Sequence, residues 1–277
     1  MKNKITKYTS TDDISFFLYI RKIVVDLYDK RYFIKLLFLR TLKNRYKGSV
    51  LGLLWTLLSP IITMITMALI FPLIMKFRIE NYVVYLFSGF MGWHLISSSI
   101  TNGGSSILSR SGLLKKYSLP KIIIPFTVSL VEVFNFFITL MALIIVLFLL
   151  NYDISINVLY LMATFFITYI FGLSLSIMAS VLFVYIRDLQ HLIGVLMQGL
   201  FYLTPIIYTV AIIPAKYMYL MNLNIFYYYI HLFHGSIYDE SLITIESFLI
   251  PSLISIFTLI FSLLIFKTLE KNIIYRL

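Results

Sequence analysis

Few side chains in this sequence could do chemistry, and most of them lie inside or beside long apolar stretches. Glu132 stands in the middle of one such stretch, with Asn135 one helical turn away on the same face. A carboxyl group in that setting could relay a proton, line a polar path or make a protonated structural hydrogen bond. A relay needs a second acidic group in mid-membrane, and the other apolar stretches carry none. The sequence therefore favours a structural or path-lining role for Glu132.

Histidine and cysteine usage argues against metal and catalytic sites. His231 and His234 are one helical turn apart, which permits metal binding, but no carboxylate or third histidine accompanies them at a fixed spacing. His94 follows Trp93 in an apolar stretch and is expected to be a packed side chain. The chain has no cysteine, which excludes disulfides, cysteine-ligated metals and thiol catalysis. We predict no metal site and no catalytic residues.

Nucleotide-binding motifs are missing as well. No glycine is followed by Lys-Ser or Lys-Thr, so the phosphate-loop pattern G-x-x-x-x-G-K-[ST] does not occur. No glycine-rich dinucleotide fingerprint follows a strand either. We expect this chain to bind no cofactor, and any energy it uses to come from an ion gradient or from another polypeptide.

The formal net charge is +11, and twelve of the 23 Lys and Arg residues lie in the first 47 positions. In a membrane chain such a run reflects positive-inside bias more often than nucleic-acid binding, so we predict no nucleic-acid partner. Residues 1–29 are predicted to be a cytoplasmic tail with a local helix near 14–27. Basic residues recur near helical spacing over 30–47, which predicts a helix in the headgroup layer, facing membrane lipid. That helix could be a plain anchor or a docking site.

A second basic segment, residues 110–121, is partly apolar, and Pro120 would end any helix within it. A short helix of this kind could fit a groove on a partner protein, or the segment could be an ordinary basic turn; spacing alone does not decide. Arg187 and Asp188 follow a later apolar stretch, where a local ion pair or a smaller partner contact is possible.

The elements that position these residues are membrane spans. The chain is 60% hydrophobic and 13% charged, and its mean hydropathy is +0.93, far more apolar than a soluble domain. We predict an all-α membrane protein whose transmembrane domain covers 30–277. Its six spans are placed at 50–75, 82–108, 122–150, 158–185, 189–210 and 248–266.

Connecting segments set the orientation of these spans. With six spans, 20 Lys and Arg residues fall on one side and three (Lys76, Arg78 and Lys216) on the other, so both termini are predicted to be cytoplasmic. The long outer segment 211–247 is aromatic, and its apolar runs at 217–223 and 226–237 are too short to span. We expect them to be re-entrant or interfacial helices. Tyrosines here, with Tyr202 and Tyr208, permit stacking on sugar rings.

Several ordered motifs resemble the membrane-spanning subunits of bacterial ABC-2 type polysaccharide exporters, and the O-antigen permeases most of all. The resemblance begins near residue 39 and includes a pattern R-Y-K-x-S-x-L-G-x-x-W-x-x-x-x-P over 45–60. It continues through 85–93, the Lys115-Lys116…Pro120 loop, Arg187-Asp188 and the pattern F-x-x-[ST]-P-[IV]-[IL]-[YW] over 201–208. It departs from the family at Ile225, where an Asn-Pro turn is usual, and at His234, where an arginine is usual.

The resemblance implies a homodimer in the bacterial inner membrane with two copies of a separate ATPase, which would bind ATP and Mg²⁺. The substrate would be a polysaccharide on undecaprenyl pyrophosphate. Contacts to the ATPase are implied for Leu113, Leu114, Lys115, Lys116, Tyr117, Pro120, Lys121, Arg187 and Asp188. Attraction of the pyrophosphate is expected at Arg40, Lys43, Arg45 and Lys47. Channel or outer-gate positions would be Trp55, Trp93, Glu132, Tyr202, Tyr208, Tyr227, Tyr228 and His234.

Three other functions remain to be weighed. An ABC-2 permease for lipids or drugs would share the fold and the ATPase. An ion-gradient transporter would need paired intramembrane charges and an internal repeat, and only Glu132 is present. A glycan-processing enzyme would need converging acids, for which Asp239, Glu240 and His234 are scattered candidates.

Overall fold

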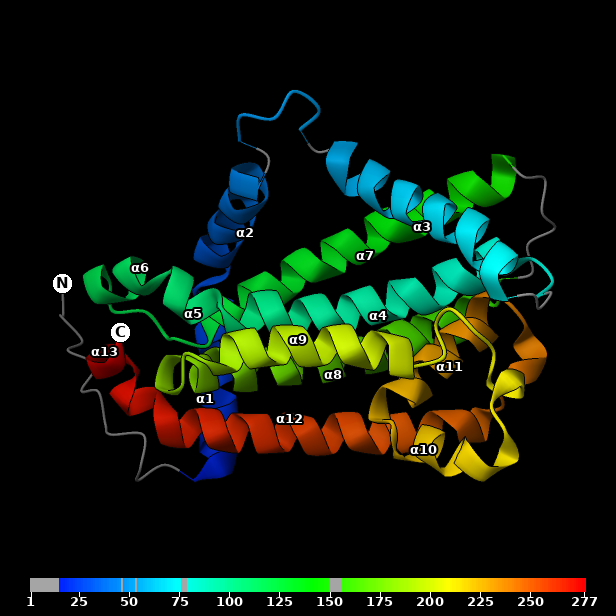
Figure 1. The fold of residues 1–277 in the computed structure, drawn as a ribbon. Helices are drawn as coiled ribbons and strands as arrows, with labels where there is room; N and C mark the ends of the chain where they lie inside the picture. The colour runs from blue at the N-terminus through cyan, green and yellow to red at the C-terminus, as the bar shows by residue number, and fades with distance from the viewer. Residues whose placement is uncertain (1–14, 46, 53, 76–78, 150–155) are drawn as a thin grey trace, which may run out of the picture.

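Long helices lying side by side form the body of the protein (Figure 1). A computed structural model describes residues 15–45, 47–52, 54–75, 79–149 and 156–277. Over these residues all regular structure is helical, and five helices are long and apolar enough to cross a membrane. They are α3 (Leu54–Met75), α4 (Tyr82–Gly104), α7 (Ile123–Leu149), α8 (Val158–Tyr185) and α12 (Leu249–Leu269). The all-helical membrane fold is confirmed.

Small residues let α4 and α8 approach closely at the centre of this bundle. A Cβ on Gly103 would lie 3.0 Å from the Cα of Ser176, and one on Gly172 would lie 3.1 Å from Ser99 Oγ. Membrane helices pack through such small residues because lipid gives no hydrophobic drive for their association. Gly104 meets the ring of Phe183 in the same way. The core of the protein therefore lies along the α4–α8 seam.

The span predicted at 189–210 is shorter in the structure. Helix α9 covers Leu189–Leu203, and at about 1.5 Å per residue its 15 residues reach about 22 Å, less than the ~30 Å hydrocarbon core. Pro205 has no amide hydrogen to continue the helix. Even so, α9 carries the chain from the end of the bundle that holds α6 (Ser111–Lys116) and α13 (Ile273–Arg276) to the opposite end (Figure 1).

Over residues 210–248, six short helices lie at that opposite end of the bundle. They are η2 (Val210–Ile212), η3 (Ala215–Tyr217), α10 (Met218–Leu223), α11 (Ile225–Ile237), η4 (Glu240–Leu242) and η5 (Ile245–Phe248). The two apolar runs predicted to be short helices thus form α10 and α11. Helix α11 packs on α4 and α8, and eight of its residues are buried, so it belongs to the core of the bundle.

Two N-terminal helices run across the direction of the spans: α1 (Phe16–Asp29) and α2 (Arg31–Arg45) (Figure 1). The helix predicted over 30–47 is therefore present over 31–45, and residue 46 lies outside the described residues, as do 1–14 of the predicted tail. Helix α1 buries Tyr19 and Ile23, and the Tyr19 hydroxyl donates to Glu270 Oε2 at 2.9 Å. Burial and the neighbouring carboxylate raise the pKa of Tyr19. This contact ties α1 to η6 (Glu270–Asn272), close to the C-terminus.

Candidate functional site

Glu132 is buried on α7 and both of its oxygens accept hydrogen bonds from amide groups. Asn102 Nδ2 of α4 donates to Oε1 at 2.9 Å, and Asn135 Nδ2 donates to Oε2 at 2.8 Å. The exposed fraction is 2% for Glu132 and 3% for Asn135. Paired amide donors lower the cost of holding a carboxyl group in an apolar bundle. This arrangement fits the structural or path-lining roles that the sequence favoured.

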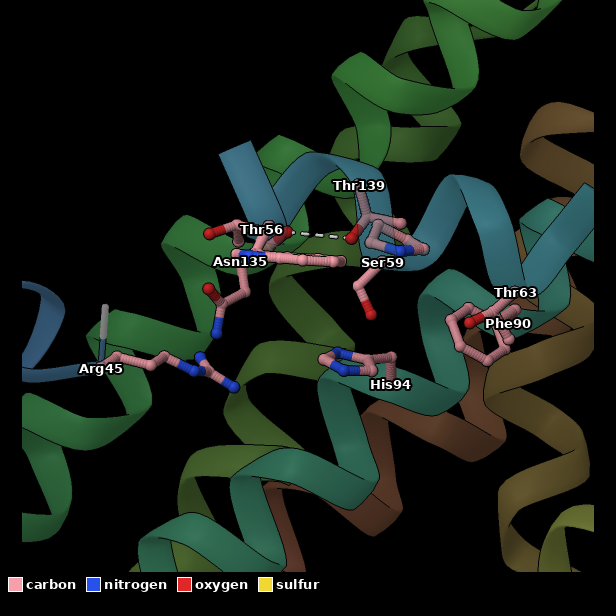
Figure 2. A pocket seen from close by; sticks show the side chains of 10 residues that line it. Arg45, Thr56, Ser59, Thr63, Phe90, His94, Asn135 and Thr139 are labelled. Atoms are coloured by element: carbon pink, nitrogen blue, oxygen red, sulfur yellow. Dashed lines mark hydrogen bonds between the residues drawn. The ribbon is translucent and has the colours of Figure 1, made fainter. Parts of the chain in front are cut away.

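A polar cavity of about 270 Å³ opens beside this pair, between α3, α4 and α7, and we call it the α3 cavity (Figure 2). Asn135 lines it, and its Oδ1 is buried without a hydrogen-bond partner among the described residues. The cavity is also lined by Arg45, Trp55, Thr56, Ser59, Pro60, Thr63, Phe90, His94 and Thr139. His94, which was predicted to be a packed side chain, therefore lines this cavity. On α3, residues 56, 59 and 63 share one face because their spacing follows the helical repeat.

A second cavity of about 230 Å³, the α5 cavity, adjoins α5 (Ser106–Ser109) and shares Arg45 with the first. Arg110 also lines it, and its Nη2 donates to Thr41 Oγ1 of α2 at 3.0 Å. Burial lowers the pKa of Arg110, although an arginine keeps its charge at neutral pH. The remaining lining residues are Thr41, Asn102, Ser105, Ser109, Val128, Val131 and Glu132. Two guanidinium groups thus border a single polar space.

The residues expected to contact an ATPase divide into two groups at the end of the bundle that holds α6. Lys115, Lys116 and Tyr117 are exposed at the end of α6, whereas Leu114 is buried in the packed cluster beneath it. Lys121 Nζ donates to the Glu270 carbonyl at 2.7 Å, and burial lowers its pKa. Leu113 and Pro120 are half-buried, and Arg187 and Asp188 are exposed in the turn after α8. The exposed members are accessible to another protein.

Two predicted channel or gate residues are packed inside the protein. Trp93 lies edge-on to Phe201 and Phe226, with ring centroids 5.8 and 5.5 Å apart. The His234 ring stacks on Tyr85 at 3.9 Å, its Nδ1 lies 2.8 Å from Ser88 Oγ, and its Nε2 donates to the Pro205 carbonyl at 3.1 Å. His234 therefore joins α11 to α4 and to the turn after α9.

The predicted tyrosines do not line either cavity; Tyr202 lies in the last turn of α9, and the others lie in the segments that follow it. The Tyr208 hydroxyl donates to the Tyr202 and Leu203 carbonyls, both at 3.2 Å, and the Tyr228 hydroxyl donates to the Asn222 carbonyl at 2.9 Å. Tyr227 stands beside Tyr228, with centroids 5.7 Å apart. Of the predicted channel set, only Trp55 and Glu132 border the two cavities. Among the described residues, no three His, Asp or Glu side chains come together as a metal site would require.

Sequence reasoning did not single out Asn102, Ser59 or Thr63, although each lines one of these cavities. The three-to-four-residue spacing of the α3 hydroxyls was a detectable signal for a polar helix face. Nothing in the sequence indicated that Asn102 would meet Glu132, because the two are 30 positions apart on different helices.

Comparison with known proteins places these features in context. Residues 32–238 match the ABC-2 type transporter family. The chain is 31% identical over 188 residues to an O-antigen export system permease protein RfbA of Klebsiella pneumoniae, covering 67% of this chain and 72% of that protein. A second RfbA from the same species is 32% identical over 186 residues, with the same coverage. RfbA of Myxococcus xanthus is 31% identical over 195 residues, covering 70% of this chain and 75% of that protein.

Proposed function

The chain belongs to the ABC-2 type transporter family, and we propose that it is the permease subunit of an ATP-driven exporter for a lipid-linked cell-surface polysaccharide, an O-antigen, at the bacterial inner membrane. The observation that carries this proposal is the match to three O-antigen export permeases over about two thirds of the chain. The helical membrane fold agrees with it. As a permease, this chain moves substrate and leaves ATP hydrolysis to a partner.

The proposed topology has six crossings with both termini in the cytoplasm. Since α1 and α13 lie at one end of the bundle, an even number of crossings is needed, and α9 supplies the sixth despite its length (Figure 1). The excess of Lys and Arg at that end supports a cytoplasmic location. Helices α10 and α11 then lie on the outer side, where α11 dips back into the bundle.

The proposed partner is an ABC ATPase in two copies, docked on α6 and on the turn after α8. The exposed Lys115, Lys116 and Tyr117 offer charge and an aromatic contact, and Leu114 anchors α6 to the bundle so that motion of the partner reaches the spans. A second copy of this chain is proposed to complete the channel. Only 6% of the apolar window of α3 is buried within one chain, against 78% for α4, so α3 has a broad apolar face left for lipid or a second copy.

The lipid pyrophosphate is proposed to approach Arg40, Lys43, Arg45 and Lys47. All four side chains are exposed at the end of α2 or just after it. Replacing all four with Gln should reduce surface polysaccharide while leaving co-purification with the ATPase intact, because the exposed Lys115, Lys116 and Tyr117 are unchanged. Normal surface polysaccharide in that variant would remove this part of the proposal.

Co-purification in mild detergent tests the function as a whole. We expect a Walker-motif ATPase to accompany the tagged permease in equal amount, and Lys115→Glu/Lys116→Glu to lose it. Lys115→Glu alone is tested beside Lys216→Glu, which reverses one exposed lysine at the opposite end of the bundle and should keep the ATPase. If the wild-type chain purifies alone in every detergent tried, a gradient-driven transporter becomes the better hypothesis. If the ATPase binds but deletion leaves surface polysaccharide normal, the substrate is a lipid or drug.

A further inference from the structure

We propose that the α3 cavity is a binding site for the sugar ring that directly follows the diphosphate of the substrate. This inference rests on the proposed function, and it adds a site inside a single subunit for one defined part of the substrate. Two observations support this site: Asn135 has a buried amide oxygen without a partner among the described residues, and a polar cavity lies beside it in an otherwise apolar bundle.

The size of the α3 cavity fits a single sugar. Its volume of about 270 Å³ would hold several water molecules at about 30 Å³ each. It is slightly smaller than the ~300–1,000 Å³ typical of pockets for drug-sized ligands. A monosaccharide-sized group therefore fits, whereas a folded-over length of polysaccharide does not.

The lining of the α3 cavity combines the groups that a sugar needs. Ser59, Thr63 and Thr139 bring hydroxyls to the lining, and Asn135, which also lines the cavity, has a buried Oδ1 without a partner among the described residues. The Thr139 hydroxyl donates to the Asn135 carbonyl at 3.0 Å, which leaves its oxygen free to accept from a ligand. A pyranose carries hydroxyls that both donate and accept, so it could satisfy groups of both kinds.

Two aromatic side chains supply the apolar part of this lining. Trp55 and Phe90 lie on the α3 cavity from different helices, α3 and α4. The C–H face of a sugar ring is apolar and packs on aromatic rings, whereas its edge is polar. A purely apolar lipid tail or drug would offer no hydrogen-bond partner to the Ser59 and Thr63 hydroxyls or to Asn135 Oδ1, which costs free energy.

The charge distribution selects which sugar of the substrate would bind. Arg45 borders both cavities, and Arg110 borders the α5 cavity alone. A diphosphate between these two guanidinium groups would hold the attached sugar at the α3 cavity. Glu132 also borders the α5 cavity, but both of its oxygens already accept from Asn102 and Asn135. The head of a glycosyl diphosphate lipid matches this order of groups.

Trp55 makes the proposal measurable by fluorescence. The chain has two tryptophans, and only Trp55 lines the α3 cavity. In a Trp93→Phe background Trp55 is therefore the sole tryptophan of the permease. The full-length permease with its ATPase would be titrated with farnesyl diphosphate N-acetylglucosamine, its glucosyl counterpart and sugar-free farnesyl diphosphate. We expect at least one sugar-bearing probe to change Trp55 emission and to bind at least about tenfold more tightly than farnesyl diphosphate.

Variants on α3 locate the sugar within the protein. Ser59→Ala/Thr63→Val removes two cavity hydroxyls with little change of shape, and should weaken the sugar-bearing probe about tenfold while leaving farnesyl diphosphate unchanged. Thr66→Val is the matched control, because Thr66 is exposed on the same helix and its hydroxyl bonds to the Ile62 carbonyl. That control should bind all three probes as the Trp93→Phe protein does.

Other outcomes overturn the proposal. Equal affinity for probes with and without sugar would mean that only the diphosphate or the tail is recognised. Equal weakening by Thr66→Val and by the cavity variant would place the sugar elsewhere. In both cases a permease that still carries its ATPase and still exports polysaccharide keeps its proposed function, so the two failures are distinguishable.

Discussion

Helices α4 and α3 are consecutive in the chain, yet they have opposite relations to the rest of the protein. Of the apolar window of α4, 78% is buried, against 6% for α3. Helix α4 carries glycines and serines that let α8 and α11 come close, whereas α3 packs mainly on α7 and α4 and leaves a polar cavity between them. Within one chain, α4 therefore belongs to a closely packed core and α3 to a loosely packed edge.

The largest effect should come from filling the α4–α8 seam. Gly103→Val puts side-chain atoms where the backbone of Ser176 lies 3.0 Å away, and should destabilise the protein by about 3 kcal/mol or prevent folding. Thermal unfolding in detergent would measure it. Gly199→Val on α9 is the control, since a Cβ there has no atom within 4 Å. Equal losses at the two sites would contradict the view that the seam is the rigid part.

A somewhat smaller loss should follow where the core borders the cavities. Glu132→Ala removes the acceptor for Asn102 and Asn135 and should cost about 2 kcal/mol, because buried amide donors are left without partners. Thermal unfolding of Glu132→Ala and of Glu132→Gln would measure the loss and would distinguish missing hydrogen bonds from an effect of any substitution at this position. Glu132→Gln keeps one carbonyl acceptor and should lose less. An unchanged midpoint in Glu132→Ala would mean that these hydrogen bonds contribute nothing to stability.

A pH effect of about 1.4 kcal/mol is expected from His234, which packs between α11 and α4. Burial lowers the pKa of His234 to about 3, below the ordinary value of 6.5, so the ring is neutral in the folded state. The unfolded chain takes up the proton below pH 6.5, and stability is therefore lost as the pH falls from 6.5 toward 3. At pH 5.5 this amounts to about 1.4 kcal/mol.

Melting curves at pH 7.5 and 5.5 would measure that loss in the wild type and in His234→Gln. His231 also has a lowered pKa because of burial, so His231→Gln is the comparison that isolates the contribution of His234. The same pH dependence in wild type and His234→Gln would show that His234 is not the group responsible.

The smallest change is expected at the edge itself. Thr63→Val keeps the shape of the side chain in a partly open cavity and should alter unfolding by no more than about 0.5 kcal/mol. Differential scanning calorimetry of the purified protein in detergent would measure the change in stability. A loss as large as that of Gly103→Val would show that α3 is as tightly packed as α4.

Sequence reasoning located the long helices well because an apolar stretch of about 20 residues is a strong signal. The span predicted at 158–185 has the bounds of α8, and the span predicted at 122–150 differs from α7 by one residue at each end. The span predicted at 189–210 was too long, because a hydropathy profile does not show that Pro205 ends α9 near Leu203. The family match then confirmed the resemblance read from residues 45–60 onward.

Composition, charge and ordered motifs thus determined that this chain is an apolar, helical membrane protein of the ABC-2 family, because those properties are local in the sequence. Tertiary structure alone decided the neighbours of each polar group. It buried Trp93 and His234, joined Asn102 to Glu132, and placed Arg45 between two cavities. Such contacts depend on which helix faces pack together, and that choice is made by shape and hydrogen bonding between segments far apart in the chain.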